Sequence, residues 1–423
     1  MNVNNQSLDT AGQFSVLLRL DSSRFTMLIN GLLMPLIAVL TLVTNVLVVA
    51  TLLRRQMRSP TNALLAALAV SDTLTSVCPL PCFLRFYAVG RRYSDWVPYS
   101  WCFAYFCLTD YLPTVFHTAS IWLTTSLAAQ RYAHVCCRVD SKLRQFLCSM
   151  RGAVRVICGV YITAIASQAC RFGELTFSAV VVPSLLNTTP HDDGNTTTVV
   201  EVTACQYEQT AFIARHETVY YNIYYWSRVV LIHLIPCTAL VVLNARLIRT
   251  MRAAHNRRRR MSPWSTLGGG RRAEARASKD EVQALTSSSN AVALVPLNPP
   301  RQRRSSTVSG SDSSTRSTRM LLVVVGVFLL VEVPLSVLLL LVIVENTFGL
   351  DLFSDTARYT AALFVNCSIA VACPLNFFVY CAMSERFRRM FGALFSRRTN
   401  FNNAPPSAQG AVHRTARTEL HSH

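Results

Sequence analysis

Long apolar blocks alternate with shorter polar segments along the 423-residue chain. Seven blocks are long enough to cross a hydrocarbon core of roughly 30 Å, which requires about 20 helical residues. They span approximately residues 25–53, 62–87, 104–135, 153–170, 220–247, 320–344 and 359–381. Their apolar residues are continuous instead of occurring at every second position, which favours helices over a β-barrel. The expected fold is therefore an all-α membrane protein, with a seven-transmembrane helix bundle.

A short amphipathic helix is expected directly after the seventh block. There Phe387, Met390 and Phe391 are interleaved with arginines, a pattern typical of a helix that lies on the inner membrane surface. The predicted order is an extracellular tail (1–24), the first five spans with their loops (25–251), a disordered basic cytoplasmic loop (252–317), the last two spans (318–381), the amphipathic helix (382–396) and a cytoplasmic tail (397–423).

Positive charge lies next to one set of block ends. The net charge of +19 comes mainly from arginines that follow the first, third, fifth and seventh blocks. By the positive-inside rule these loops are cytoplasmic, so the N-terminus is extracellular and the C-terminus cytoplasmic. We expect a multi-pass protein of the plasma membrane, in contact with membrane lipid. Because topology accounts for the basic flanks, a nucleic-acid partner is not expected.

Glycosylation sequons indicate the same orientation. They begin at Asn5, Asn187 and Asn195, and all three fall in segments predicted to be extracellular. A single sequon arises easily by chance, but three on one side of the membrane support the predicted topology.

Four polar side chains lie near mid-depth in their spans: Asn45, Asp72, Ser120 and Asn376. Polar groups in hydrocarbon are costly, and a buried carboxylate needs a partner. The pattern leaves two alternatives, a hydrogen-bond cluster between helices without an ion and a cluster that binds a cation.

Two motifs at the inner ends of the spans narrow the fold class. Ala128-Ala129-Gln130-Arg131-Tyr132 ends the third block, and Asn376-Phe377-Phe378-Val379-Tyr380 lies in the seventh. With seven spans, the chain resembles the rhodopsin-class (class A) G-protein-coupled receptors. The resemblance implies that Arg131, Tyr132, Asn376 and Tyr380 take part in G-protein coupling and activation. It also implies that Asn45, Asp72, Ser120 and Asn376 form an allosteric sodium site, and no other cofactor is expected.

Several positions depart from the general pattern of that class. Gln130 replaces the usual acid before Arg131, Phe377 replaces a proline, and Glu332 stands where a tryptophan is usual. Without an acid beside Arg131, one restraint on the inactive state is missing, so raised basal activity is expected.

The departures themselves resemble one family. Segments 117–125, 240–244, 328–334 and 374–377 are similar to the sex peptide receptor family, also known as receptors for myoinhibitory peptides. The resemblance implies an extracellular amidated peptide as ligand and a heterotrimeric G protein of the Gi/o type. Arrestin and receptor kinases are further expected partners. The alternative is a peptide receptor of the same class with a different ligand.

The resemblance also suggests a disulfide bond. Cys102 matches the family cysteine at the top of the third span, and Cys205 matches its partner in the long outer loop. An oxidising exterior permits this bond. Cys107, one helical turn deeper, is the competing partner for Cys205.

Charged and aromatic residues in the outer halves of the spans are candidates for the ligand pocket. Charged groups there are expected to line a water-filled cavity. The candidates are Arg85, Asp110, Arg171, Tyr225, Arg228 and Glu332. Asp110 and Glu332 could pair with a cationic peptide group.

Other functional classes are less compatible with the sequence. An enzyme is not expected, because His117 and His233 are single intramembrane histidines without a visible set of catalytic partners. A transporter would be expected to show broken helices with polar gaps in two halves of the chain. The only deep acids are Asp72 and Glu332.

Overall fold

The computed structural model describes residues 6–8, 14–20, 23–89, 96–186, 198–254, 256–257, 309–350, 354–385 and 387–393. The sequons at Asn5, Asn187 and Asn195 lie outside these residues, as do the cytoplasmic tail from residue 397 and most of the predicted cytoplasmic loop.

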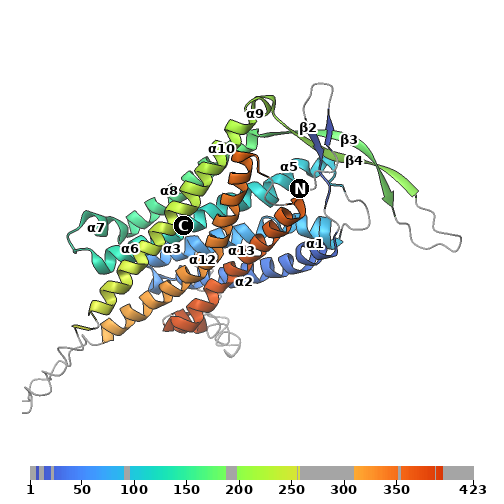
Figure 1. The fold of residues 1–423 in the computed structure, drawn as a ribbon. Helices are drawn as coiled ribbons and strands as arrows, with labels where there is room; N and C mark the ends of the chain where they lie inside the picture. The colour runs from blue at the N-terminus through green and yellow to red at the C-terminus, as the bar shows by residue number, and fades with distance from the viewer. Residues whose placement is uncertain are drawn as a thin grey trace, which may run out of the picture.

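Seven helical stretches, the spans, run side by side in one bundle and confirm the predicted fold class (Figure 1). The first span is built from α1 (Arg24–Leu28), a π-helical segment (Ile29–Leu33) and α2 (Met34–Leu52). The second is built from α3 (Pro60–Val77), α4 (Leu80–Cys82) and a π-helical segment (Phe83–Val89). The third is built from a 3-10 turn (Tyr99–Trp101), α5 (Cys102–Phe106), a π-helical segment (Cys107–Tyr111) and α6 (Leu112–Cys136). A 3-10 turn (Arg55–Met57) joins the first two.

The remaining spans follow after the short α7 (Lys142–Leu147). The fourth span is built from α8 (Met150–Gln168) and a 3-10 turn (Ala169–Gly173). The fifth is built from α10 (Glu217–Ser227), a π-helical segment (Arg228–Leu234) and its helical continuation to Ala254. The sixth is α12 (Ser309–Phe348), and the seventh is α13 (Asp355–Met383). The short α9 (Ala211–Arg215) precedes α10. Because α12 begins at Ser309, the end of the predicted disordered loop is helical.

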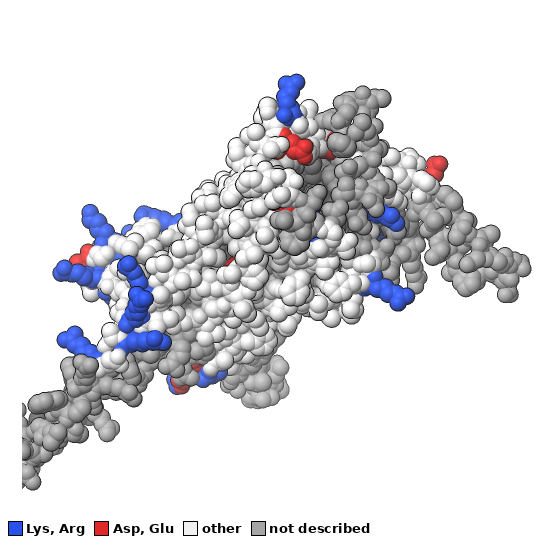
Figure 2. Space-filling view, viewed as in Figure 1, with Lys and Arg blue, Asp and Glu red and all other residues white. Residues whose placement is uncertain are grey.

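Six of the seven spans are long and apolar enough to cross a membrane by length and composition alone. The third span is not among them, and it carries Asp110, His117, Gln130 and Arg131. This polar span packs against α3 and α8, so neighbouring helices shield much of it from lipid. On the face shown in Figure 2, lysine and arginine side chains gather mainly at the end of the bundle near α7, as the basic flanks predicted.

The outer end of the bundle carries a sheet that the hydrophobic pattern did not predict. β1 (Gln6–Leu8), β2 (Phe14–Leu17), β4 (Thr198–Gln209) and β3 (Leu175–Leu186) pair antiparallel in this spatial order. Beyond β2, the Leu18 N–H donates to the Cys205 carbonyl at 2.9 Å, and the Val97 N–H donates to the Leu18 carbonyl at 3.2 Å. The N-terminal segment is therefore fixed between two outer loops.

The disulfide bond joins Cys102, at the start of α5, to Cys205 in β4. Cys107 is a free cysteine. The predicted pairing is thus confirmed, and the competing one is wrong. The bond ties the outer sheet to the third span.

A short helix follows α13, over residues 385–393 apart from residue 386, which is not described. The Ser384 hydroxyl caps it by accepting the Phe387 N–H at 3.2 Å. Phe387 is buried, lies 5.8 Å from the ring of Tyr380 and stacks on Phe391. The apolar side of the predicted amphipathic helix therefore packs against the inner end of the seventh span.

The turn between α7 and α8 requires glycine at position 152. The Ser149 hydroxyl accepts the Gly152 N–H at 2.9 Å and caps α8. A Cβ atom at Gly152 would lie 1.8 Å from the Phe146 carbonyl oxygen, which is backbone and cannot rotate away.

Gly152→Ala is therefore expected to lower the stability of the purified protein by about 1–3 kcal/mol, the usual cost of forcing extra atoms into a packed site. Gly159→Ala is the matched control, because nothing lies within 4 Å of its added Cβ. The control should be neutral or gain up to about 1 kcal/mol from helix propensity. Thermal unfolding in detergent measures both. Equal melting temperatures for the two variants would contradict the expected clash.

Candidate functional site

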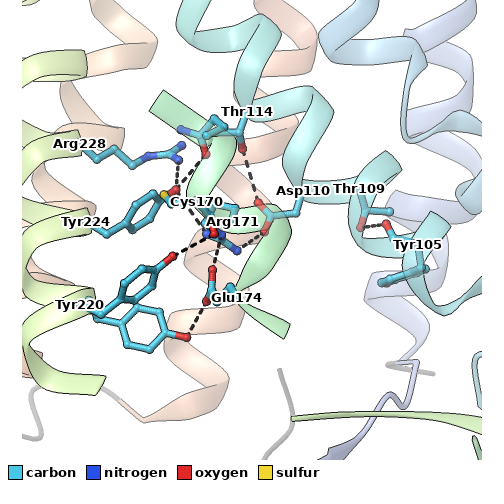
Figure 3. Close-up of polar contacts among 12 residues, drawn as sticks. Tyr105, Thr109, Asp110, Thr114, Cys170, Arg171, Glu174, Tyr220, Tyr224 and Arg228 are labelled. Atoms are coloured by element: carbon cyan, nitrogen blue, oxygen red, sulfur yellow. Dashed lines mark hydrogen bonds and ion pairs between the residues drawn. The ribbon is translucent and has the colours of Figure 1, made fainter. Parts of the chain in front are cut away.

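Arg171 is the centre of a polar cluster at the outer end of the bundle (Figure 3). It lies in the 3-10 turn after α8. Its Nη2 is 2.7 Å from Asp110 Oδ2, and its Nε is 2.8 Å from Glu174 Oε2. The guanidinium also lies over the rings of Tyr111 and Tyr224, at 5.3 and 5.2 Å from their centroids. Arg171 therefore links the third, fourth and fifth spans and is already engaged by two carboxylates.

Tyr224 connects a second arginine, Arg228, to this cluster. Its hydroxyl accepts from Arg228 Nη1 at 3.0 Å and from Arg171 Nη1 at 3.3 Å, and it donates to Gln168 Oε1 at 3.1 Å. Arg228 Nε is buried and has no hydrogen-bond partner among the described residues. This donor of Arg228 is thus unused in the present arrangement.

Glu174 is held from the side of the fifth span. Tyr221 donates its hydroxyl to Glu174 Oε1 at 2.6 Å, and the Tyr225 ring stacks on Tyr221 with centroids 5.8 Å apart. Tyr225 was a predicted pocket residue, whereas Glu174 and Gln168 were missed. The spacing of Glu174 three residues after Arg171 was the available signal, since residues i and i+3 face each other in a helical turn.

Asp110 is the most open carboxylate of the cluster. Its side chain is 43% exposed, although Oδ2 is held by Arg171. The other oxygen, Oδ1, has a long contact of 3.5 Å with the Thr114 hydroxyl. This oxygen can accept a hydrogen bond from an incoming donor without breaking the ion pair.

Arg85 does not belong to this cluster. Its side chain is exposed in the π-helical segment of the second span, and it forms no hydrogen bond or ion pair with the described residues. The predicted outer-pocket set is therefore brought together only in part, by Asp110, Arg171, Arg228 and Tyr225.

Three of the candidate residues lie in π-helical segments. Asp110 occurs in Cys107–Tyr111, Arg228 in Arg228–Leu234, and Arg85 in Phe83–Val89. A π-helical turn adds a residue to the helical repeat and rotates the following side chains, and such turns occur often at functional sites. The direction in which Asp110 and Arg228 point could not be read from an α-helical periodicity.

Glu332 lies deeper in the bundle than the Arg171 cluster, and its side chain is buried. Its carboxyl lies 3.0 Å from His117 Nε2 in α6 and 3.2 Å from His233 Nδ1 in the fifth span. Glu332 is 1% exposed and His233 is fully buried. Glu332 is therefore paired inside the protein, and its pairing with His117 and His233 was not predicted.

Asp72 is the centre of a second group of hydrogen-bonded side chains within the spans. The Ser120 hydroxyl donates to its Oδ1 at 2.7 Å, and the Asn376 amide donates to its Oδ2 at 2.9 Å. The fourth predicted member, Asn45, is buried, and neither its amide oxygen nor its nitrogen has a hydrogen-bond partner among the described residues. Three of the four predicted side chains thus form one cluster.

A cavity connects these two intramembrane groups. It offers about 40 Å³ to the centres of water-sized molecules, more than the roughly 10–15 Å³ that one water needs. Its polar lining is Asp72, His117, Ser120, Thr124, Glu332 and Asn376. Carboxylate, hydroxyl and amide oxygens suit a hard cation, so this lining fits a sodium ion.

The inner end of the third span shows what replaces the missing acid. Gln130 is 2% exposed, and its Nε2 donates to the Leu147 carbonyl of α7 at 2.7 Å. It therefore fixes the second inner loop to the third span. Arg131 and Tyr132, the predicted coupling residues, follow directly on the same helix, and Tyr380 is buried at the end of the seventh.

Comparisons with known proteins match this architecture. Residues 44–380 match the model of the 7 transmembrane receptor (rhodopsin family). The chain is 28% identical to the sex peptide receptor of Drosophila melanogaster over 88% of this chain and 73% of the relative. It is 26% identical to sex peptide receptor-related protein 2 of Caenorhabditis elegans, over 87% and 71%. It is 24% identical to the FMRFamide receptor of Drosophila melanogaster, over 91% and 57%. The chain belongs to the rhodopsin family of seven-transmembrane receptors and is not an enzyme.

Proposed function

We propose that this chain is a plasma-membrane receptor for an extracellular amidated peptide of the myoinhibitory type, and that it signals through Gi/o. Its N-terminus is extracellular and its C-terminus cytoplasmic. The observation that carries the peptide proposal is the outer cluster, where the Asp110 side chain is 43% exposed and its Oδ1 has only a long contact of 3.5 Å. The names of similar proteins, which include a sex peptide receptor and an FMRFamide receptor, support a peptide ligand.

Within this proposal, each residue of the outer cluster has a separate task. Asp110 accepts an N–H of the peptide, such as a terminal carboxamide or ammonium group, and Arg228 donates to a peptide carbonyl. Tyr225 offers a ring face to an aromatic side chain. Arg171 positions Asp110 and does not need to touch the ligand, because its guanidinium is held by ion pairs with Asp110 and Glu174 and by a hydrogen bond to Tyr224.

The inner end supplies the coupling surface in this proposal. Arg131, Tyr132, Asn376 and Tyr380 take part in opening it to the G protein, and arrestin and receptor kinases bind the same side. A sodium ion would be held by Asp72, Ser120 and Asn376, where its charge would compensate the buried carboxylate.

The first test is G-protein activation in cells that express the chain, challenged with a panel of amidated neuropeptides and their free-acid forms. A saturable, pertussis-toxin-sensitive response at submicromolar amidated peptide is expected. Silence across the panel, with the receptor detected at the cell surface, would remove the ligand class and leave the receptor family unchanged.

Asp110→Asn is expected to raise the half-maximal peptide concentration by roughly 10- to 100-fold. A hydrogen bond to a charged group contributes about 1.5–3 kcal/mol, and each 1.4 kcal/mol is tenfold in affinity. Concentration–response curves at matched surface expression measure this change. Asp140→Asn, at an exposed position in the inner loop, is the control and should leave the curve in place. A normal curve for Asp110→Asn would exclude this carboxylate as a peptide contact.

A further inference from the structure

The cluster of Glu332, His117 and His233, which we name the histidine–glutamate bridge, joins three spans at mid-depth. His117 comes from α6, His233 from the fifth span and Glu332 from α12. The two histidines contact different carboxylate oxygens, His117 at Oε1 and His233 at Oε2. A single side chain of α12 is thus held from two sides, so α12 cannot move away from either neighbour without losing one contact.

The two histidines are the polar partners of a buried carboxylate. A carboxylate that is 1% exposed is costly to keep ionised unless a cation is close. His233 Nε2 is buried without a hydrogen-bond partner among the described residues, so an added N–H there would be left unsatisfied. His117 lines the cavity, where water can solvate it.

The bridge lies next to the proline of α12, so it can affect how this helix bends and where its inner end lies. Glu332 stands two residues before Pro334, which lies inside the helix and lacks an N–H donor. The Ser336 hydroxyl donates to the Glu332 carbonyl at 2.7 Å and so spans this interruption. Proline positions are where long helices bend. A change of bend at Pro334 would displace the Glu332 carboxyl relative to both histidines.

We propose that the histidine–glutamate bridge is a restraint that holds α12 against α6 and the fifth span in the resting receptor, and that its loss favours the signalling arrangement. A restraint present only in the resting state biases a two-state equilibrium by its differential contribution to the two states. The proposal depends on the receptor family and on coupling to a G protein, but not on the identity of the peptide.

Other ionisable groups lie near the bridge and define what its test must keep constant. Asp72 and Cys373 face it across the cavity, while Arg228 and Cys237 lie on its own side of the fifth span. These groups are left unchanged in all variants, and ligand-free signalling is compared at one pH and one sodium concentration.

The decisive variant is Glu332→Gln, which keeps the size and hydrogen-bonding groups of the side chain but removes its charge. We expect ligand-free G-protein activation, measured against the four G-protein families at equal surface expression, to rise roughly five- to tenfold. Leu330→Ala is the matched control on the same helix, since the Leu330 side chain is 76% exposed. An unchanged basal signal for Glu332→Gln at normal surface expression would overturn the proposal.

His233→Gln and the double variant with Glu332→Gln complete the test. If the two residues act as one restraint, the double variant will signal about as strongly as the stronger single variant. Independent effects that multiply would contradict a shared bridge. If Glu332→Gln fails to reach the surface, His117→Gln replaces it as the test, because this variant removes only the contact between Glu332 and the partly exposed His117. Raised basal activity of His117→Gln supports the restraint, and wild-type basal activity refutes it. Because no peptide enters these measurements, their failure is separate from failure of the proposed ligand.

Discussion

Cys102→Ser and Cys205→Ser are each expected to remove most of the receptor from the cell surface. The bond closes a segment of 103 residues. In the chain-entropy model, a crosslink over about 100 residues stabilises the folded state by about 4–5 kcal/mol. Both cysteines are buried, and the backbone of Cys205 also pairs with Leu18 and Val97. Loss of the crosslink therefore loosens the outer sheet and the third span together.

Surface labelling of intact cells, compared with total receptor, measures this effect. A loss of at least roughly tenfold is expected for each single variant, and the double variant should be no worse, because each single variant already removes the bond. Cys107→Ser is the matched control, as Cys107 is a free cysteine one turn away and should retain wild-type surface labelling. Equal losses for Cys107→Ser and Cys102→Ser would indicate damage unrelated to the crosslink.

Arg171→Gln is expected to abolish the peptide response over the accessible concentration range. Without the guanidinium, the carboxylates of Asp110 and Glu174 lose their shared cation, and two tyrosine rings lose their contact with it. Removing one partner of a buried ion pair costs about 3–5 kcal/mol. Because the Asp110 side chain is 43% exposed, solvent screens part of this cost. The Glu174 side chain is 5% exposed and receives little such relief.

Two further variants separate charge from geometry at this position. Arg171→Lys keeps the positive charge but loses the forked guanidinium, so an intermediate shift in potency is expected. Arg85→Gln removes an exposed arginine of the second span that has no ion-pair partner among the described residues, and should leave potency unchanged. Peptide dose–response curves at equal surface expression provide the measurement. A wild-type response from Arg171→Gln would show that the outer cluster is dispensable for ligand recognition.

The helix bundle could be predicted because hydrocarbon selects for long apolar runs, and this selection is visible in the sequence. The outer sheet was missed although Val180, Val181 and Val182 are typical strand residues. Its N-terminal strands pair with a loop far along the chain, and such long-range pairing leaves no local periodicity. Burial raises the pKa of the Tyr207 phenol in β4 to about 12, a property of that packed sheet and not of the local sequence.

The candidate site could be predicted only as a set of residue types. The hydrogen bonds of Asp72 followed the family resemblance, and the structure reproduces them for Ser120 and Asn376. The partners of Glu332 and Arg171 could not be predicted, because they depend on how each helix is rotated about its axis. Four π-helical segments among the described residues change that rotation within the outer half of the bundle. Sequence periodicity carries no record of these local insertions.

The pairing of β2 with β4 fixes an order of events during synthesis. The ribosome makes β2 before the first span, but its partner strand appears only after the fourth span has been made. β2 can therefore pair with β4 only after the first four spans have been made. Substitutions in residues 14–20 should consequently act late, when the sheet at the end of the bundle is assembled from segments that lie far apart in the chain.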